Sequence, residues 1–522
     1  MKKLASTIML QGTASDVGKS ILTAALCRIF YQDGNNVAPF KSQNMSLNSY
    51  VTLDGKEIGR AQGMQADACF TVATTDMNPI LLKPKQDMVS QVVVHGKPYK
   101  DLDARSYREL YLHTAEGIVK ESLLHLREKY DLIAIEGAGS PAEVNLKDSD
   151  IVNMRLAKWA EAPVILVADI DRGGVFASIV GTLEILTPEE RDRVCGFIIN
   201  KFRGDVSLLQ PGIDWLEERT GKPVLGVIPF LHHIGLEDED GASLDTKIKS
   251  TVKGEHQLDI AVIKLPRISN FTDFDPLLDE LDVHLRYVSN LEEWGNPDVV
   301  IIPGSKNTMQ DLLFLREFGI EDKILEYVEQ GGFLLGICAG YQMLGKRLLD
   351  PNFYESDVSE IEGLGLFPME TTFVETKRTE RVEGNALIFT SMLGEQEHSG
   401  ENVISNDVEG YEIHMGITRF LQPVQHAFEI RLTGHKDHSF HNDGVLSENE
   451  RVMGTYIHGI LDNDILRRSW LNRVRWNKGW EAKEVESSYR NQREEAFERL
   501  AEHVRKYLDM KKVYQIIEEG SK

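Results

Sequence analysis

Short apolar runs rich in β-branched residues alternate along the chain with segments of helical periodicity. In the first half the runs lie at 7–10, 132–136, 164–168, 196–200 and 224–228, and in the second half at 260–263, 299–302, 333–337 and 453–457. Strands that alternate with helices in this way form parallel sheets, so we predict an α/β fold. Each run in the first half ends in a polar or glycine-rich turn, which is where such sheets bind their ligands.

The length of 522 residues predicts two to four domains, because one hydrophobic core rarely serves so long a chain. Acidic, glycine-containing sequence at 236–243 separates the two sets of apolar runs, and after about Asn472 the chain becomes charged and helical. We therefore predict two doubly wound parallel-sheet domains with a helical C-terminal tail. The predicted boundaries are a first domain at 1–235, a linker at 236–257, a second domain at 258–472 and the tail at 473–522.

The composition limits which binding partners and which cellular compartment we expect. The formal net charge of -24 disfavours nucleic acid and anionic membranes, because like charges repel. The four cysteines are too few and too scattered for a disulfide framework or a zinc site. No signal-peptide pattern is present, and no stretch approaches the roughly 20 apolar residues that span a bilayer. We therefore expect a reduced, cytoplasmic enzyme without membrane insertion, and its oligomeric state is left open.

A glycine-rich turn between the first strand and the first helix reads Gly-Thr-Ala-Ser-Asp-Val-Gly-Lys-Ser at 12–20. Backbone amides of such a turn, with the helix N-terminus, bind phosphate oxygens. We assign Gly12, Thr13 and Gly18 to a nucleotide site, with Lys19 on the outer phosphates of ATP and the Ser20 hydroxyl on Mg²⁺. The spacing between the glycines is one residue longer than in the standard P-loop, and it resembles dethiobiotin synthetase and its relatives. The alternative is a glycine turn with a chance Gly-Lys-Ser.

Polar residues follow other predicted strands at the same edge of the sheet. Glu136 ends one strand, and our hypothesis is that it ligates the metal; a helix cap or a turn salt bridge is the alternative. Asp171 and Arg172 follow the next strand, where a substrate or metal role competes with an ordinary polar turn. Asn200 follows a further strand, and reading an adenine edge competes there with a simple turn-forming role.

A second glycine-bracketed turn, Gly-Ile-Cys-Ala-Gly at 336–340, follows a strand and precedes a helical pattern. We predict that Cys338 is exposed on this tight turn and that the helix N-terminus favours its thiolate. His458, at the end of another predicted strand, would accept the thiol proton and deliver it to departing ammonia. Backbone amides of Gly304 and Ser305 are the candidate oxyanion hole. A buried structural cysteine is the alternative for Cys338.

The two halves together predict one coupled reaction. ATP converts a carboxylate to an acyl phosphate, and ammonia released from the side chain of glutamine at Cys338 displaces the phosphate to give an amide. The first domain is then an ATP-dependent amide synthetase and the second a glutamine amidotransferase.

Nine segments from both halves resemble one family, the glutamine-hydrolysing cobyric acid synthases, which join a dethiobiotin synthetase-like ATPase to a class I-type glutamine amidotransferase. The resemblance runs from about Ser6 to Asp462. The segments are Lys-Ser-Gln-Asn-Met-Ser at 41–46, Met-Asn-Pro-Ile-Leu-Leu-Lys-Pro at 77–84, Ser-Gln-Val-Val-Val at 90–94, Glu-Gly-Ala-Gly-Ser-Pro-Ala-Glu at 136–143, Asp-Ile-Asp-Arg-Gly-Gly-Val-Phe at 169–176, Asn-Lys-Phe-Arg-Gly-Asp at 200–205, Asn-Phe-Thr-Asp-Phe-Asp at 270–275, Pro-Gly-Ser-Lys-Asn-Thr at 303–308 and Gly-Tyr-Glu-Ile-His-Met-Gly at 410–416.

The resemblance implies four successive amidations of adenosylcobyrinic acid a,c-diamide, at side chains b, d, e and g, in cobalamin biosynthesis. It also implies a nucleophile at Cys338 and a catalytic histidine at His458. Cationic side chains gather in the ligand-edge segments of this acidic chain, where they could neutralise a polycarboxylate. Our candidate substrate-binding residues are Lys41, Asn44, Asp171, Arg172 and Arg203.

Two positions depart from related patterns. Ala339 stands where many relatives have glycine, and Ile460 stands where other cysteine-dependent amidotransferases carry the glutamate that orients the histidine. Asp462 is one substitute for that glutamate, although a surface turn aspartate is the more ordinary interpretation. The rival functions are a cobyrinic acid a,c-diamide synthase with the same chemistry, a stand-alone ATP-dependent carboxylase like dethiobiotin synthetase, and a non-catalytic ATP-binding regulatory protein.

Overall fold

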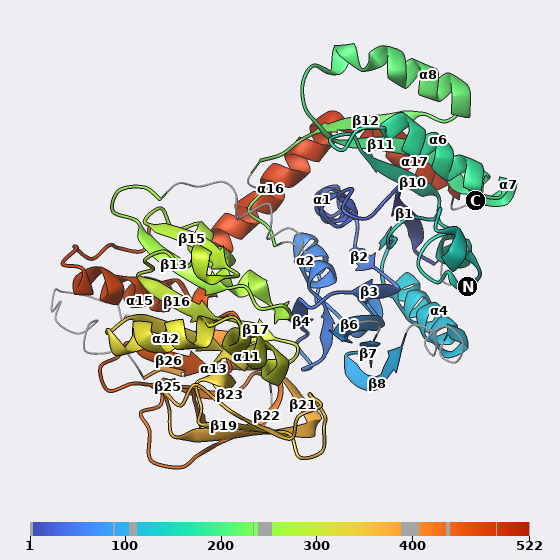
Figure 1. Ribbon diagram of the computed structural model, residues 1–522. Coiled ribbons are helices and arrows are strands. Elements are labelled where there is room, and N and C mark those ends of the chain that lie inside the picture. Colours follow the sequence, from blue (N-terminus) through green and yellow to red (C-terminus); the bar gives the residue numbers. More distant parts are fainter. Residues whose placement is uncertain are drawn as a thin grey trace. The chain divides into compact units, whose positions relative to one another are not determined.

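The computed structural model describes residues 4–86, 89–103, 112–232, 234–237, 253–387, 407–434, 439–486 and 488–520. Contacts divide the chain into two compact units (Figure 1). The first unit contains Met1–Ser46, Glu57–Glu239 and Gln492–Lys522, and the second contains Leu47–Lys56 and Asp240–Asn491. The domain boundaries drawn from the sequence stay a prediction, and residues 238–252 of the predicted linker lie outside the described residues.

A six-stranded parallel sheet forms the centre of the first unit. Its strands are almost wholly buried and apolar, as expected for a parallel sheet covered by helices on both faces. In spatial order they are β12 (Val224–Pro229), β11 (Val194–Phe202), β10 (Val164–Asp169), β1 (Ser6–Gly12), β9 (Leu132–Glu136) and β2 (Val37–Phe40). The strand β1 pairs with both β9 and β10, so the connections diverge on either side of it. The carboxyl end of β1 is therefore the switch point where such sheets bind ligands.

A smaller, mostly antiparallel sheet and a set of helices complete the first unit. The sheet contains β3 (Gln43–Met45), β6 (Ile80–Gln86), β7 (Val89–Val94) and β8 (Lys97–Asp103), and a short strand β5 (Glu57–Gly59) leads into the second helix. The helices are α1 (Lys19–Gln32), α2 (Arg60–Ala68), α4 (Leu112–Lys129), α5 (Met154–Ala160), α6 (Val175–Ile185), α7 (Pro188–Arg193), α8 (Gln210–Thr220), α16 (Tyr489–Tyr507) and α17 (Met510–Gly520).

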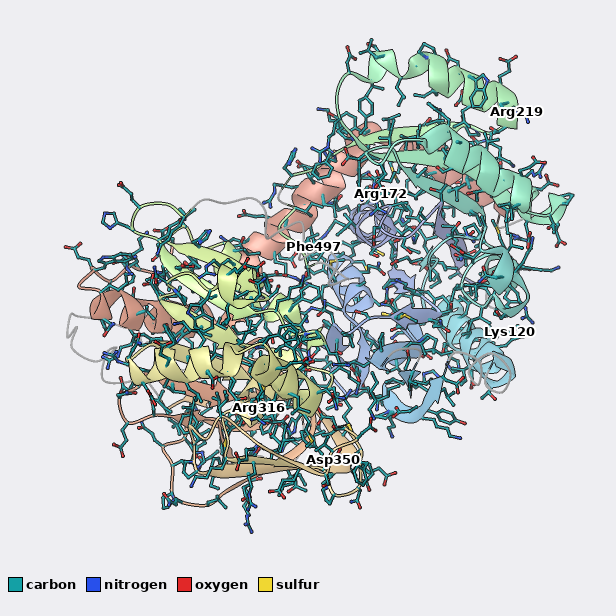
Figure 2. The ribbon with its side chains drawn as sticks, viewed as in Figure 1. Lys120, Arg172, Arg219, Arg316, Asp350 and Phe497 are labelled. Carbon is teal, nitrogen blue, oxygen red and sulfur yellow. The ribbon has the colours of Figure 1, made fainter. Side chains whose placement is uncertain are left out.

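The C-terminal helices α16 and α17 belong to the hydrophobic core of the first unit. Phe497 on α16, labelled in Figure 2, is buried in the same apolar cluster as residues of β1 and α1. Arg28 of α1 is 1% exposed and forms ion pairs with Glu494 and Glu498 of α16 at 2.7 and 3.4 Å. Its guanidinium carbon also lies 5.0 Å from the centre of the Phe497 ring. Residues 492–522 of the predicted helical tail are therefore a structural part of the first unit, whereas residues 473–491 belong to the second unit.

The second unit has its own parallel sheet. In spatial order its strands are β15 (Val283–Val288), β13 (Leu258–Ile263), β16 (Val299–Ile302), β18 (Phe333–Ile337), β26 (Val452–Thr455) and the antiparallel edge strand β25 (Val445–Leu446). Its helices are α10 (Asp275–Leu278), α11 (Thr308–Glu317), α12 (Ile320–Glu329), α13 (Ala339–Met343) and α15 (Asp464–Asn477). The neighbouring strands β18 and β26 place the segments that follow them side by side.

A second sheet in this unit is mostly antiparallel, with β19 parallel to β21, and the sequence did not predict it. It is built from β20 (Glu360–Glu362), β19 (Arg347–Leu349), β21 (Met369–Ala386), β23 (Phe428–Leu432) and β24 (His441–Asp443), with β22 (Asp407–Phe420) paired to β21. A two-stranded ribbon joins β14 (Ile268–Ser269) to β17 (Gly304–Ser305), and a short strand β4 (Ser49–Val51) lies in the 47–56 part of this unit.

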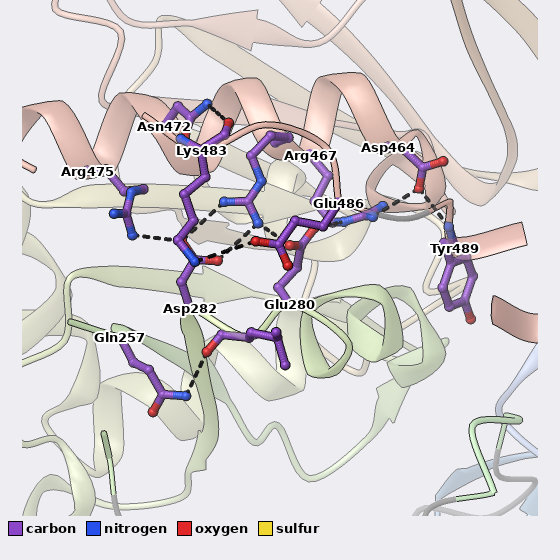
Figure 3. Close-up of polar contacts among 12 residues, drawn as sticks. Gln257, Glu280, Asp282, Asp464, Arg467, Asn472, Arg475, Lys483, Glu486 and Tyr489 are labelled. Carbon is purple, nitrogen blue, oxygen red and sulfur yellow. Dashed lines mark hydrogen bonds and ion pairs between the residues drawn. The ribbon is translucent and has the colours of Figure 1, made fainter. Parts of the chain in front are cut away.

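A buried ionic network fixes α15, the helix that follows the β26 loop, to the start of β15 (Figure 3). Arg467 contacts Glu280 at 2.8 Å, and Arg468 and Arg475 contact Asp282 at 3.0 and 2.8 Å. Burial raises the pKa of Asp282, but these guanidinium groups outweigh it and hold that pKa below its usual value. Removing one partner of such a network leaves a buried charge uncompensated, so the loop after β26 is held firmly.

The predicted fold class is confirmed. The apolar runs read from the sequence lie within β1, β9, β10, β11, β12, β13, β16 and β18, and the last run begins within β26. The two parallel sheets with helices on both faces were predicted, and the antiparallel additions were not. Across the part of the chain that the structure describes, no helix combines the length and the apolarity needed to cross a membrane.

Candidate functional site

The glycine-rich turn after β1 has the backbone of a phosphate-binding loop. A Cβ atom on Gly12 would lie 2.7 Å from the Ala14 carbonyl oxygen and 2.8 Å from the Lys19 Nζ atom, so only glycine fits there. Gly18 has a φ of 95°, a conformation that favours glycine, and it is the N-cap residue of α1. Thr13 donates its backbone N–H to the Val167 carbonyl oxygen at 2.9 Å, which ties the loop to β10.

Asn200 at the end of β11 shapes this loop. Its Nδ2 atom donates to the Val17 carbonyl oxygen at 2.8 Å, and the residue is largely buried. The predicted contact to an adenine edge stays a prediction. The structure places Asn200 against the loop backbone with its amide nitrogen engaged there.

Three polar side chains converge on one carboxylate at the same edge of the sheet. Glu136 is 1% exposed and accepts hydrogen bonds from Ser20 Oγ at 2.8 Å, Lys41 Nζ at 2.9 Å and Gln65 Nε2 at 2.6 Å. Lys19 Nζ donates to the carbonyl oxygens of Ala14 and Gly139 at 3.0 and 3.2 Å. The structure therefore brings together the residues predicted for phosphate and metal, and it adds Lys41 from the predicted substrate set.

The other predicted substrate residues lie apart from this carboxylate. Arg172, labelled in Figure 2, contacts Asp16 of the phosphate loop at 3.3 Å. Arg203 pairs with Asp171 at 2.9 Å, and both side chains are partly exposed. Asn44 is buried and donates its Nδ2 hydrogen to Gln62 at 3.0 Å.

A mostly apolar cavity of about 550 Å³ lies in the first unit beside Gly139. Its wall is formed by strands β3, β6 and β7 and by the segment after β9, and it includes Gln43, Met45, Leu82 and Ser140. Its volume is that of a pocket for a bound small molecule. None of the five predicted substrate-binding residues lines this cavity. The sequence did not reveal the cavity because its wall is mostly apolar, and apolar strand residues carry no chemical motif.

Cys338 occupies a strained turn between β18 and α13. Its φ of 52° lies in the left-handed region, as for nucleophiles held on a sharp strand-to-helix turn. A Cβ atom on Gly336 would lie 2.8 Å from the Gly340 carbonyl oxygen, and one on Gly340 would lie 1.9 Å from the Ile302 carbonyl oxygen. Both glycines are therefore required for the turn.

The prediction that Cys338 is exposed was wrong. The residue is only 6% exposed, and its Sγ atom lies 3.6 Å from the Ile413 carbonyl oxygen as a hydrogen-bond donor. The strand β22, which belongs to the unpredicted antiparallel sheet, supplies this cover. The Cys338 thiol is therefore shielded from bulk solvent.

His458 follows β26 and completes a chain of three side chains. Its Nδ1 atom lies 2.7 Å from Asp273 Oδ2, while Asp273 Oδ1 accepts the Gly459 N–H at 3.0 Å. Its ring also interacts with the Cys338 side chain. Burial lowers the pKa of His458, but Asp273 and Cys338 outweigh burial and raise that pKa to about 10. The imidazole is therefore protonated at neutral pH.

Asp273 is the orienting carboxylate that the sequence reasoning missed. It is 2% exposed and lies in a 3-10 turn, η6 (Phe271–Phe274), 185 residues before His458. Ile460 offers no polar group, and the Asp462 side chain is exposed. In the sequence, the signal for Asp273 is its place in the resemblance segment at 270–275.

Gly304 and Ser305 lie next to this histidine. A Cβ atom on Gly304 would lie 3.1 Å from His458 Cε1, which places the backbone of β17 at the edge of the imidazole. The Ser305 hydroxyl donates to Asp311 at 2.6 Å. The structure thus brings Cys338, His458 and Gly304 into one site of the second unit.

Comparisons with known proteins identify both halves. Residues 259–465 match the CobB/CobQ-like glutamine amidotransferase domain, and residues 8–244 match the CobQ/CobB/MinD/ParA nucleotide binding domain. The cobyric acid synthase of Desulforamulus reducens is 50% identical over 514 residues, which cover 98% of each chain. That of Geobacillus sp. (strain WCH70) is 50% identical over 508 residues, covering 97% of this chain and 96% of the relative. That of Dehalococcoides mccartyi (strain ATCC BAA-2266 / KCTC 15142 / 195) is 50% identical over 523 residues and covers all of both chains.

Proposed function

The chain belongs to the cobyric acid synthase family, and from that premise we propose that it amidates the b, d, e and g carboxylates of adenosylcobyrinic acid a,c-diamide. It is an ATP-dependent, glutamine-utilising ligase of cobalamin biosynthesis. One observation carries the proposed chemistry: His458 lies between the Asp273 carboxylate and the side chain of Cys338.

Cys338 attacks the side-chain carbonyl carbon of glutamine as the thiolate and forms a glutamyl thioester. His458, which is protonated because Asp273 raises its pKa, donates the Nε2 proton to the departing ammonia. It then takes a proton from the water that hydrolyses the thioester. Backbone amides at Gly304 and Ser305 are proposed to stabilise the oxyanion, which is supported by the position of Gly304 against the imidazole.

The residues at the carboxyl end of β1 fit Mg-ATP. Ser20 Oγ and Glu136 lie 2.8 Å apart and offer the hard oxygen ligands that Mg²⁺ prefers, with phosphate oxygens supplying the rest. Bound Mg-ATP supplies the phosphoryl group that turns a substrate carboxylate into an acyl phosphate. Lys19 neutralises the outer phosphates, and the close backbone at Gly12 lets the loop amides reach them.

The acceptor is a large macrocycle whose rim carries carboxylates. Two features of the nucleotide-binding unit support such an acceptor: the apolar cavity beside Gly139, and the cations Lys41, Arg172 and Arg203 at the ligand edge. We propose that Asn44 and Asp171 assist these cations. Ammonia from glutamine displaces the phosphate at each activated carboxylate.

Mass spectrometry tests this proposal. Cobyrinic acid a,c-diamide is incubated with the protein, Mg-ATP and glutamine, and each amidation replaces a hydroxyl by an amino group, so the steps can be counted. Four successive steps are expected. If the mass of cobyrinic acid a,c-diamide does not change, the corrin assignment is unsupported. Cobyrinic acid is the control substrate for the rival a,c-diamide synthase, which would add two amides to it. Inactivity with every acceptor would favour a regulatory protein.

Lys19→Ala is expected to reduce amidation at least about a hundredfold with either glutamine or ammonium as nitrogen source. The substitution removes the charge that stabilises the transferring phosphoryl group, so both nitrogen sources are affected equally. Product formation is measured with each source, and basal glutaminase activity is followed separately. Lys120→Ala, which removes an exposed lysine on α4 that pairs with Glu116, is the matched control. Retained amidation in Lys19→Ala would remove this residue from the phosphate site.

A further inference from the structure

The segment Leu47–Lys56 belongs to the glutaminase unit, although the residues before and after it belong to the nucleotide-binding unit. We call it the 47–56 segment. Its contacts lie at the catalytic histidine. Ser49 donates its backbone N–H to Asn270 Oδ1 at 2.9 Å, and Asn48 Oδ1 accepts the Phe271 N–H at 3.1 Å. Each segment thus contributes one asparagine side chain that accepts a backbone N–H of the other segment.

These contacts are buried and extend along the segment. Asn48, Ser49 and Asn270 are 1%, 0% and 2% exposed. Arg381 of β21 donates its Nε hydrogen to the Val51 carbonyl oxygen at 2.8 Å, which fixes the far end of β4. Buried side-chain to backbone hydrogen bonds are costly to lose, because the remaining partner stays desolvated.

The contacts act on two of the side chains beside the His458 ring, those of Asn270 and Asp273. Asn270 precedes the η6 turn, and its carbonyl oxygen accepts the Asp273 N–H at 3.0 Å, so its position sets that of the orienting carboxylate. Its own φ of 51° is left-handed, which asparagine tolerates better than most residues. Since Ser49 engages Oδ1, the amide of Asn270 is oriented with Nδ2 toward His458 Nε2, 3.4 Å away.

We infer that the 47–56 segment is a positioning element for glutamine hydrolysis, with Asn48 and Asn270 as positioning residues for His458. The inference rests on the proposed roles of Cys338 and His458. A donor at Nε2 favours the unprotonated ring nitrogen and opposes the effect of Asp273 at Nδ1. The histidine therefore releases its proton to departing ammonia more easily, and a reversed amide would instead hold that proton.

The chain connects this element to the acceptor cavity. Met45 at the end of β3 lines the cavity, and only Ser46 and Leu47 separate it from Asn48. Ser46 donates its N–H to the Leu82 carbonyl oxygen at 3.1 Å, and Leu82 lines the same cavity.

The test compares Asn48→Leu with Asn48→Asp. Leucine removes the acceptor for the Phe271 N–H at similar volume, whereas aspartate keeps an acceptor oxygen. Glutamine hydrolysis is measured with Mg-ATP and cobyrinic acid a,c-diamide present. In Asn48→Leu we expect kcat to fall roughly tenfold to a hundredfold, because a catalytic group is misplaced. We expect the KM for glutamine and ammonium-driven amidation to be unchanged and Asn48→Asp to recover most of kcat. Asp54→Asn, which alters a residue that pairs with Lys56 in the same segment, is the matched control.

Asn270→Asp provides a second variant if Asn48→Leu does not fold, as judged by thermal unfolding. It keeps an acceptor for the Ser49 N–H but replaces the donor that faces His458 by a carboxylate oxygen. We expect a lower kcat for glutamine hydrolysis and an altered pH dependence of Cys338 alkylation by iodoacetamide. Wild-type kcat in folded Asn48→Leu or Asn270→Asp would overturn the inference. Full glutamine-driven synthesis in Cys338→Ala would instead overturn the proposed function, so the two failures are distinct.

Discussion

Cys338→Ala is expected to reduce glutamine-driven amidation at least about a thousandfold while leaving ammonium-driven amidation unchanged. In the proposed mechanism the Cys338 thiolate forms the covalent intermediate from which ammonia departs. Ammonium supplied in solution bypasses this step, since the acyl phosphate is proposed to form beside Lys19 and Glu136, which belong to the other unit. Amide formation is measured with glutamine and with ammonium chloride at saturating Mg-ATP.

Cys195→Ser is the matched control for the loss of a cysteine. Its Sγ atom lies 3.3 Å from the Arg193 carbonyl oxygen in the nucleotide-binding unit, far along the chain from the glutaminase residues. Wild-type activity is expected with both nitrogen sources. Equal loss of the glutamine-driven and ammonium-driven reactions in Cys338→Ala would contradict the proposed role of this thiol.

Much of the nucleotide-binding unit could be predicted because its signals are local. The strand, the glycine turn and the helix around Gly12 and Lys19 are consecutive in sequence, and the structure gives them the expected backbone. The nucleophile turn at Cys338 is local in the same sense, since Gly336 and Gly340 report its close packing. Such motifs constrain backbone conformation directly, so spacing alone identifies them.

Contacts between distant segments were not predictable in the same way. Asp273 lies in an irregular turn far from His458 in sequence, and no periodicity joins the two. The long strands β21 and β22 carry many charged residues, so their alternation of apolar and polar positions is weak. Because β22 covers the nucleophile, missing that sheet also led to the wrong expectation that Cys338 is exposed.

Asp273→Asn is expected to reduce glutamine hydrolysis by about 10²- to 10⁴-fold, with ammonium-driven amidation unchanged. The Asp273 carboxylate accepts the Nδ1 hydrogen of His458 and stabilises the positive charge of the imidazolium. A neutral amide stabilises that charge poorly. Asp462→Asn is the matched control, because it removes an exposed carboxylate of the same loop. Wild-type turnover in Asp273→Asn, or a comparable loss in Asp462→Asn, would assign the orienting role elsewhere.

The same substitution has a pH signature. Burial lowers the pKa of His458, and Asp273 with Cys338 raises it to about 10, above the ordinary 6.5 that applies in the unfolded chain. A raised histidine pKa stabilises the fold fully below pH 6.5, and this stabilisation is lost as the pH rises through about 10. The difference in unfolding free energy between wild type and Asp273→Asn is therefore expected to be largest near pH 6.5 and to shrink toward pH 10. Denaturant unfolding across this range measures it. The alkaline limb of glutamine hydrolysis should move to lower pH in the variant, because the effect of burial, which lowers the pKa of His458, is then no longer offset by Asp273. A free-energy difference that grows with pH would show that Asp273 does not hold the histidine proton.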